Sequence, residues 1–135
     1  MKDASDKRVM LAEKVRDLIV QMIHDSMELP AINYSEYISR QLCVNYTLLS
    51  KSFSRTIGIT IEQYIIIQKI ERVKKMISQT ELTLSEIAWK LRYSSPAHLS
   101  AQFKRITGIA PSVFRKIKDA GNPEPDTESG ADRIV

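Results

Sequence analysis

The sequence contains a single cysteine, Cys43, and no long run of hydrophobic residues. One thiol cannot form an intramolecular disulfide framework or a multi-cysteine zinc site, and sparse cysteine is typical of a reducing cytosol. No apolar stretch approaches the roughly 20 residues of a transmembrane helix, so we expect no membrane contact. The charged residues 1–8 are not followed directly by an apolar segment, which argues against a signal peptide. These absences predict a cytoplasmic protein.

Motifs of catalysis and cofactor binding are also missing. The sequence has no G-x-S-x-G motif, no phosphate-binding glycine loop, no H-E-x-x-H pair and no paired cysteines. His24 stands alone, and a lone histidine is a weak signal of a metal site. We therefore expect no enzymatic activity, no cofactor and no bound metal.

Glycine, proline and aromatic residues are scarce, at four residues, five residues and 7%. A chain of 135 residues is expected to form one domain and can bury roughly two-thirds of its unfolded surface. Hydrophobic content of 43% and charged content of 27% are typical of a soluble globular protein. This composition favours an all-α fold.

Positive charge is concentrated in the middle of the chain. Residues 1–39 carry a net charge of −2, residues 40–118 carry +10 and residues 119–135 carry −4. Such an excess favours binding to a polyanion over a merely solvated surface. The acidic final residues are rich in Pro and Gly and lack aromatics, so we expect them to be disordered.

Residues 83–115 contain a helix-turn-helix pattern. Thr83 and Glu86 can form a capping box, and apolar residues follow at helical spacing. Ser95 can cap a second helix with a proline in its first turn, and Gly108 can end that helix in the left-handed conformation. The apolar stripe of the second helix consists of Leu99, Phe103 and Ile106. Two short helices, a tight turn and a shared apolar seam constitute a helix-turn-helix.

The same pattern occurs about fifty residues earlier. Pairs fifty residues apart include Asn33 with Thr83, Leu49 with Leu99, Phe53 with Phe103 and Gly58 with Gly108. In the first helix of each unit the spacing is forty-nine, as for Ile38 and Ile87, so the second unit has one more residue in its turn. Two copies are too few for a solenoid, and we interpret them as a tandem pair.

About seven helices are expected in all. Residues 8–27 form an amphipathic helix that covers the first unit or, alternatively, provides a dimerisation face. Thr60 caps a long helix, residues 61–78, whose wide apolar arc suits a strut between two subdomains. Three further helices are expected at residues 34–42, 45–57 and 113–117. In the helix at 45–57, Leu48 is a candidate inward residue beside Leu49 and Phe53. The expected divisions are 1–60 for the first unit, 61–78 for the linker helix, 79–118 for the second unit and 119–135 for the tail.

The segment L-S-E-I-A-W-K-L-R-Y-S-S-P-A-H-L-S-A-Q-F-K-R-I-T-G-I-A-P-S-V-F-R resembles the second-unit signature of the AraC/XylS family of bacterial transcription regulators. The match runs from about Val15 to Arg115. The resemblance implies a homeodomain-like tandem helix-turn-helix domain that binds double-stranded DNA, reads two successive major grooves and works at the nucleoid. The family usually has glycine or a small or polar residue where this chain has Cys43 and Arg92. A non-glycine residue in a left-handed turn costs on the order of 1 kcal/mol.

In the first unit, the family positions that contact bases fall on Thr47, Ser50 and Lys51. Lys51 can donate to guanine O6 and N7, and Thr47 can bond a base or offer its methyl group to thymine. Ser54 and Arg55 lie further along, where phosphate contacts are expected. The resemblance and polarity together assign DNA contacts in this half of the chain to Asn45, Tyr46, Thr47, Ser50, Lys51, Ser54, Arg55 and Lys69.

The second unit has fewer polar residues at the matching positions. His98 and Ser100 can form hydrogen bonds, whereas Ala97 and Ala101 can make only apolar contacts. His98 has an alternative role, packing against the turn. The assigned residues are Ser95, Pro96, Ala97, His98, Ser100, Ala101, Lys104 and Arg105. We expect the first unit to carry most direct specificity and the second to add electrostatic affinity and shape readout.

Other partners are expected from the resemblance and from exposed positions. Trp89 and Lys90 lie on the outward side of their predicted helix, with Trp89 expected to be partly buried, and surfaces of this kind in the family can meet RNA polymerase. We expect a monomer or a weak dimer. The competing function is a protein-interaction module without specific DNA binding. The family usually carries a separate sensor domain, and about thirty residues before the tandem units are too few for one. The chain is therefore expected to be either a fragment of a longer regulator or a stand-alone regulator.

Overall fold

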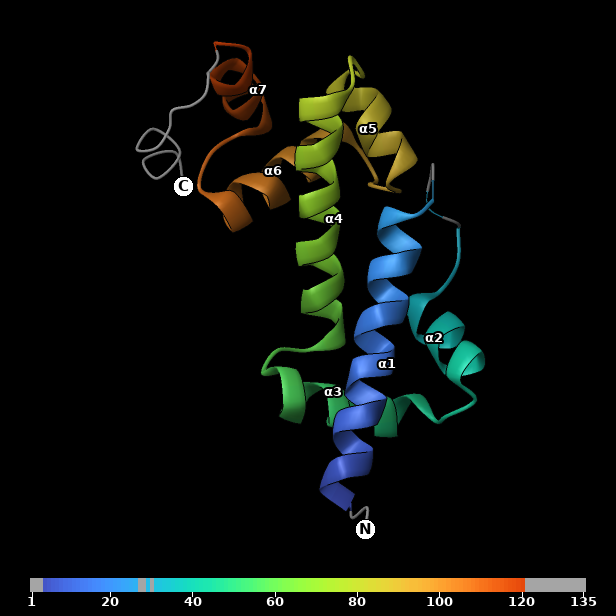
Figure 1. Ribbon diagram of the computed structural model, residues 1–135. Helices are drawn as coiled ribbons and strands as arrows, with labels where there is room; N and C mark the ends of the chain where they lie inside the picture. Colours follow the sequence, from blue (N-terminus) through green and yellow to red (C-terminus); the bar gives the residue numbers. More distant parts are fainter. Residues whose placement is uncertain (1–3, 27–28, 30, 121–135) are drawn as a thin grey trace. The chain divides into compact units, whose positions relative to one another are not determined.

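The computed structural model describes residues 4–26, 29 and 31–120, and every regular element in them is a helix (Figure 1). The helices are α1 (Ala4–His24), α2 (Tyr34–Leu42), α3 (Tyr46–Ile57), α4 (Ile61–Gln79), α5 (Leu84–Lys90), α6 (Pro96–Thr107) and α7 (Pro111–Asp119). The chain divides into two compact units, Met1–Lys69 and Ile70–Val135, and this division falls inside α4. The all-α prediction with about seven helices and a long linker helix is confirmed.

Most helix boundaries lie within a few residues of those predicted. α1 begins and ends earlier than the expected 8–27, and α4 extends one residue beyond 78. The last helix begins at Pro111 rather than at residue 113, because proline needs no N–H partner in a first turn. The expectation of disorder from residue 121 onward concerns residues outside the described part of the chain.

The first unit is built around contacts between α1 and α3, with α2 packed beside both (Figure 1). Ile19 and Ile23 of α1 and Phe53 of α3 are fully buried. The Phe53 ring meets the ring of Tyr64 edge-on, with centroids 5.4 Å apart. His24 Nε2 lies 2.8 Å from Gln68 Oε1, which ties the end of α1 to α4. α1 thus covers the inner face of α3, as predicted.

In the second unit, α6 contacts both α5 and α7. The fully buried Phe103 of α6 meets the ring of Phe114 edge-on, at a centroid distance of 5.6 Å. Arg115 Nη2 donates a hydrogen bond of 2.7 Å to the carbonyl oxygen of Leu82, which ties α7 to the segment before α5. The aromatic pairs occupy corresponding positions in the two units, so the sequence repeat is also a repeat of packing.

The predicted helix caps are present. Thr83 and Glu86 form a reciprocal capping box, and Asn33 and Ser95 accept hydrogen bonds from backbone N–H groups of the helices that follow them. The hydrogen bond from the Thr83 N–H, followed by the one involving its side chain, holds the pKa of Glu86 below its usual value. α3 and α6 both end at glycines in the left-handed region, with φ of 97° at Gly58 and 91° at Gly108.

The two turns inside the helix-turn-helix units contain non-glycine residues at positive φ. Cys43 has φ 55° and Arg92 has φ 64°. Backbone bonds still close both turns: the Val44 N–H donates to Ser39 O at 3.2 Å, and the Tyr93 N–H donates to Ala88 O at 2.9 Å. The backbone strain expected where the sequence departs from glycine is therefore located at Cys43 and Arg92.

Three predictions of burial are wrong. Leu48 is 50% exposed, because successive helix positions are about 100° apart and it lies off the face that buries Leu49. Ile106 is exposed rather than part of the α6 stripe, and Trp89 is 64% exposed rather than partly buried. The inner faces of α3 and α6 instead include the polar residues Ser52 and Gln102.

Candidate nucleic-acid interface

The outward face of α3 carries most of the polar residues assigned to DNA contact. Leu49 and Phe53 are buried and fix the inner face of the helix. Thr47 and Lys51 lie one turn apart on the opposite side, and both are exposed. Neither side chain has a hydrogen-bond or ionic partner among the described residues. The helix therefore presents a hydroxyl, a methyl group and an ammonium group from one face.

Asn45 and Tyr46 are used by the fold at the start of α3. Asn45 Oδ1 accepts hydrogen bonds from the backbone N–H groups of Thr47, at 2.8 Å, and Leu48, at 3.3 Å. The Tyr46 hydroxyl donates a 2.6 Å hydrogen bond to Glu62 Oε2. Burial, followed by this hydrogen bond and the nearby negative charge of Glu62, raises the pKa of Tyr46 well above its usual value. Both residues set the orientation of α3 and have less capacity left for direct readout.

The remaining assigned residues of this unit differ in exposure. Ser50 and Ser54 are half-buried on the flank of α3, whereas Arg55 is exposed near its C-terminal end. Arg55 has no hydrogen-bond or ionic partner within the described part of the chain. A free guanidinium near the end of a helix can donate to a phosphate oxygen.

Lys69 on α4 is half-buried, and burial lowers its pKa to about 8. A lysine with this pKa is still mostly protonated at neutral pH, although its charged form is disfavoured. An approaching phosphate would favour the charged form and raise the pKa again. The assigned phosphate contact is chemically consistent, but Lys69 is less accessible than Lys51 or Arg55.

The start of α6 holds its polar residues in defined positions. Ser95 Oγ accepts a 3.0 Å hydrogen bond from the backbone N–H of His98, and Pro96 occupies the first turn. The His98 side chain is exposed, with Nδ1 3.1 Å from Ser94 Oγ. Its ring also contacts Tyr93 edge-on, so the packing role and the exposed position predicted as alternatives occur together.

Further along α6, the small and basic residues lie at the surface. Ala97 and Ala101 are exposed, and Ser100 is half-buried. Lys104 and Arg105 are exposed near the C-terminal end and have no ionic partner among the residues described. α6 therefore combines a small apolar surface and His98 in its first half with two cations in its second half.

Four residues in or near α3 and α6 were not predicted from the sequence to be part of the interface. Leu48 is an exposed hydrophobic residue on α3, and the alternation of polar residues around it gave no signal of that exposure. Tyr93, Ser94 and Gln102 form contacts around His98. The first repeat has Val44 and Ser52 where the second has Tyr93 and Gln102. This difference is the sequence signal that could have indicated the contacts around His98.

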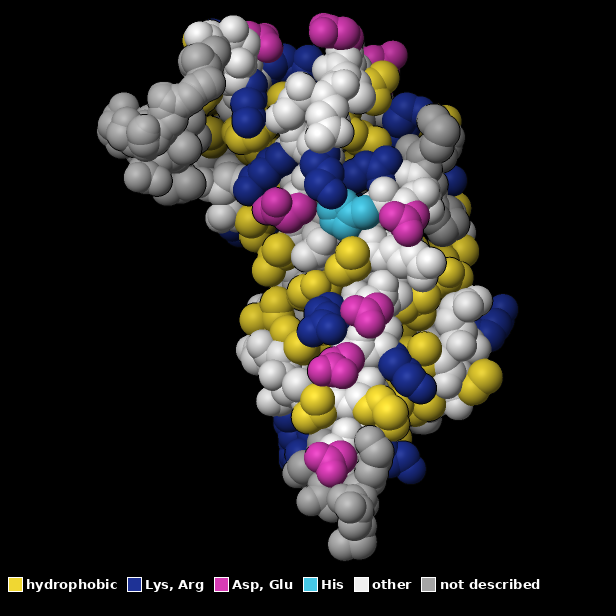
Figure 2. All heavy atoms as spheres, in the orientation of Figure 1, with side chains coloured by type: hydrophobic (Ala, Val, Ile, Leu, Met, Phe, Trp, Pro, Cys, Tyr) yellow, Lys and Arg dark blue, Asp and Glu magenta, His cyan; other side chains and the backbone are white. Residues whose placement is uncertain are grey.

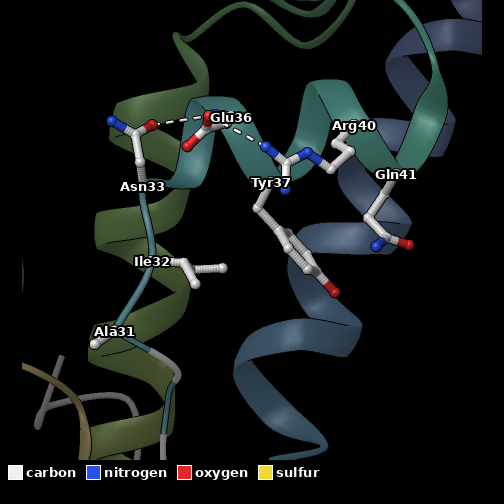
Figure 3. Close-up of a pocket in the computed structure, with 7 residues that line it drawn as sticks. All are labelled: Ala31, Ile32, Asn33, Glu36, Tyr37, Arg40 and Gln41. Carbon is white, nitrogen blue, oxygen red and sulfur yellow. Dashed lines mark hydrogen bonds and ion pairs between the residues drawn. The ribbon is translucent and has the colours of Figure 1, made fainter.

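An open hollow of about 360 Å³ lies beside α2, lined by residues of that helix and of the segment just before it (Figure 3). Glu36 and Arg40 from its lining form an ion pair of 3.2 Å, and Asn33 caps the helix from the hollow's edge. Because both charged side chains are largely exposed and neutralise each other, the hollow presents no net charge to an ionic ligand.

No group of three or more His, Cys, Asp or Glu side chains in the described ranges could hold a metal ion. No helix in that part of the chain is long and apolar enough to cross a membrane.

The face drawn in Figure 2 carries Lys and Arg side chains interspersed with acidic and hydrophobic ones, so its surface is mixed rather than uniformly basic.

Comparison with known proteins identifies related sequences and folds. Residues 38–117 match the model of a helix-turn-helix domain family. The chain is 31% identical over 114 residues to the F1 operon positive regulatory protein of Yersinia pestis, covering 80% of this chain and 36% of that protein. It is 28% identical over 106 residues to the uncharacterized HTH-type transcriptional regulator YtdP of Bacillus subtilis, covering 78% of this chain and 14% of that protein. The chain thus spans about a third or less of these relatives.

A solved structure with the same fold is the DNA-binding domain of AdpA, a global transcriptional factor, in complex with a target DNA. The TM-score is 0.70 at 18% sequence identity, and the alignment covers 84% of this chain and 97% of that chain. At 18% sequence identity, the likeness shows a shared arrangement of the helices. It does not show that the same residues contact DNA in both proteins.

Proposed function

Because the chain belongs to the AraC/XylS family of helix-turn-helix transcription regulators, we propose that it binds double-stranded DNA through α3 and α6, each in a major groove. In this proposal α3 supplies most of the direct base readout. α6 adds phosphate contacts and readout by His98. Binding of this kind would regulate transcription at specific sites.

The observation that carries the proposal is the outward face of α3. Thr47 and Lys51 are exposed on it, and Leu49 and Phe53 fix its opposite face. An α-helix fits the major groove of B-DNA, where lysine can donate to guanine O6 and N7 and a threonine methyl can contact thymine. The half-buried Ser50 lies between them and can bond to either base type.

Phosphate contacts complete the interface in this proposal. Arg55, Lys104 and Arg105 are exposed near the C-terminal ends of α3 and α6. Each contact that neutralises a phosphate releases a counterion, so affinity falls as salt rises. In this proposal, the cationic side chains bind DNA of any sequence through its phosphates, and the base contacts made by α3 determine which sequences are preferred.

The test is selection of bound sites from random duplex DNA, followed by titration at several salt concentrations. With five to eight phosphate contacts, the slope of log affinity against log salt should be about −5 to −7, at ~0.9 per contact. Arg105→Ala should lower affinity for all sequences alike and flatten the slope by roughly one. A protein-interaction module would give no selected sequence and a slope near zero, and that result would replace the proposal.

A contact with RNA polymerase is a second element of the proposal. The supporting observation is Trp89, which is 64% exposed on α5, where an indole without cover is typical of protein contact surfaces. Trp89→Ala should reduce activated transcription in a purified system and leave the affinity for duplex DNA unchanged. If the variant activates transcription as strongly as the wild-type protein when the DNA site is saturated, Trp89 does not contact RNA polymerase.

A further inference from the structure

The contacts around His98 have no counterpart in the first unit. Leu48 stands fifty residues before His98, and Val44 and Ser52 stand where the second unit has Tyr93 and Gln102. Neither leucine nor valine can form a side-chain hydrogen bond. The first unit therefore cannot build the same group of contacts, although its fold is the same.

A buried hydrogen bond between Tyr93 and Gln102 anchors the group of residues around His98. The Tyr93 hydroxyl donates to Gln102 Oε1 at 2.8 Å, and the two residues are only 7% and 8% exposed. Breaking this bond would leave a buried polar group without a partner, which is costly. The Tyr93 ring is thus fixed at its hydroxyl end as well as at its backbone.

His98 rests on this fixed ring. The two ring centroids lie 5.2 Å apart with an interplanar angle of 83°, an edge-to-face arrangement favoured by aromatic quadrupoles. On another side, Nδ1 of His98 lies 3.1 Å from Ser94 Oγ. These two contacts restrict the rotamer of the imidazole. Both neutral tautomers are compatible with them, because a serine hydroxyl can donate to Nδ1 or accept from it.

Nε2 is the polar atom of His98 that remains available. It has no hydrogen-bond partner among the described residues, and the side chain is exposed in the first turn of α6. The N-terminal residues of a recognition helix are those that reach base edges. When Ser94 donates to Nδ1, Nε2 carries the proton and can donate to an acceptor on guanine, thymine or adenine. When Ser94 accepts from Nδ1, Nε2 can accept from the amino group of adenine or cytosine.

We propose that Tyr93 and Ser94 are positioning residues that hold His98 in one rotamer, so that its Nε2 reads a single base pair in the groove contacted by α6. This inference rests on the proposed function and names the residues that orient its reader in the second unit. Gln102 acts through Tyr93, and neither contacts DNA.

The positioning can be measured in the free protein by NMR of the neutral His98 imidazole. The wild-type ring should show one side-chain rotamer. Ser94→Ala, an exposed change that leaves the core intact, removes the contact at Nδ1 and should populate additional rotamers. Tyr93→Phe keeps the ring but loses the anchor to Gln102, and should broaden the rotamer distribution. Several rotamers of His98 in the wild type, or no change in either variant, would overturn the positioning role.

The readout is tested by selection from random duplex DNA. His98→Ala should lose about five- to tenfold of the preference at one base pair of the α6 half-site. Ser94→Ala should lose part of the same preference. Thr107→Val is the matched control, since it removes a hydroxyl hydrogen bond to Phe103 O in the same helix without touching the imidazole. That variant should keep the preference even if the helix is destabilised.

The outcomes separate this inference from the proposed function. Wild-type protein that selects no sequence would overturn the proposed function and the readout, while the NMR result would still decide the positioning. Wild-type protein that selects a site, combined with His98→Ala lowering affinity equally for every base, would assign His98 to a phosphate and overturn the readout alone.

Discussion

Individual side chains at the candidate interface differ in how much of their hydrogen-bonding capacity the fold already uses. Asn45 and Ser95 cap helices, and Tyr46 donates to Glu62. Lys51 and Arg55 have no partner in the described residues. Because specificity requires donors and acceptors that are free to meet a base, the two groups should respond differently to substitution.

Lys51→Ala should relax sequence preference more than substitutions at the exposed alanines of α6. Loss of a lysine donating to guanine should cost about 1–3 kcal/mol of discrimination against the wrong base. Ser50→Ala should have a smaller effect of the same kind. Selection from random duplexes is the measurement, with Ala97→Ser and Ala101→Ser as comparison variants. Equal changes for all four variants would contradict the unequal roles of α3 and α6.

Lys69 should make stability depend on pH. Burial lowers its pKa to about 8 from 10.5, so between these values the unfolded chain binds more protons than the folded one. The free energy of unfolding therefore gains a contribution as pH rises from about 8 to 10.5. Urea unfolding across this window should show the wild type gaining stability relative to Lys69→Met. A difference independent of pH would mean that the ammonium group is not desolvated.

At the scale of elements, the turn between the two helices of each unit is the place where sequence and conformation conflict. Cys43 follows α2 with φ 55°, whereas α3 and α6 end at glycines. The Cys43 N–H still bonds to Ser39 O, so the helix end keeps its hydrogen bond at the expense of backbone strain. The same reasoning applies to Arg92 before α6.

Cys43→Gly should stabilise the protein. Removing the side chain relieves about 1–2 kcal/mol of left-handed strain, and glycine loses about 0.4–1 kcal/mol through the larger entropy of the unfolded chain. The net gain should be about 0.5–1 kcal/mol in urea unfolding. Cys43→Ala keeps the strain and removes only the thiol, so it should change stability little. A destabilised Cys43→Gly protein would show that the thiol, which lies 3.7 Å from Arg40 O, contributes more than the strain costs.

For the whole molecule, the two units share one chain and one helix, α4, whose residues contribute to both. Such a chain can bind one duplex with both units, which would make the effective concentration of the second unit high once the first has bound. Neighbouring major grooves on one face of DNA are about 10 base pairs apart. Simultaneous binding would therefore depend on the spacing of the half-sites.

One protein molecule should protect roughly 16–20 base pairs, with two strongly protected segments ~10 base pairs apart. Inserting five base pairs between these segments should remove most specific binding, because it rotates one groove to the far side of the duplex. Inserting ten restores the face and separates rotation from distance. Footprinting and competition titration are the measurements. Unchanged affinity after the five-base-pair insertion would show that the units bind independently.

Local sequence signals predicted the elements well. Asn33, Thr83 and Ser95 marked helix starts, and Gly58 and Gly108 marked helix ends, because caps and left-handed residues depend on neighbours within four positions. The side chains of the interface were less predictable. Whether Leu48 or Trp89 is covered depends on which distant helix packs nearby, and no short-range pattern contains that information.

The helices, their repeat and the basic middle segment can be predicted from the chain alone, since they follow from periodicity, capping and counted charge. Which polar residues stay available depends on how the helices pack. Tyr46 bonds to a carboxylate sixteen residues away, and Tyr93 bonds to Gln102 across the turn, whereas His98 keeps Nε2 exposed. The physical reason is that a hydrogen bond needs a partner within about 3 Å, and packing of separate helices determines which partners come that close.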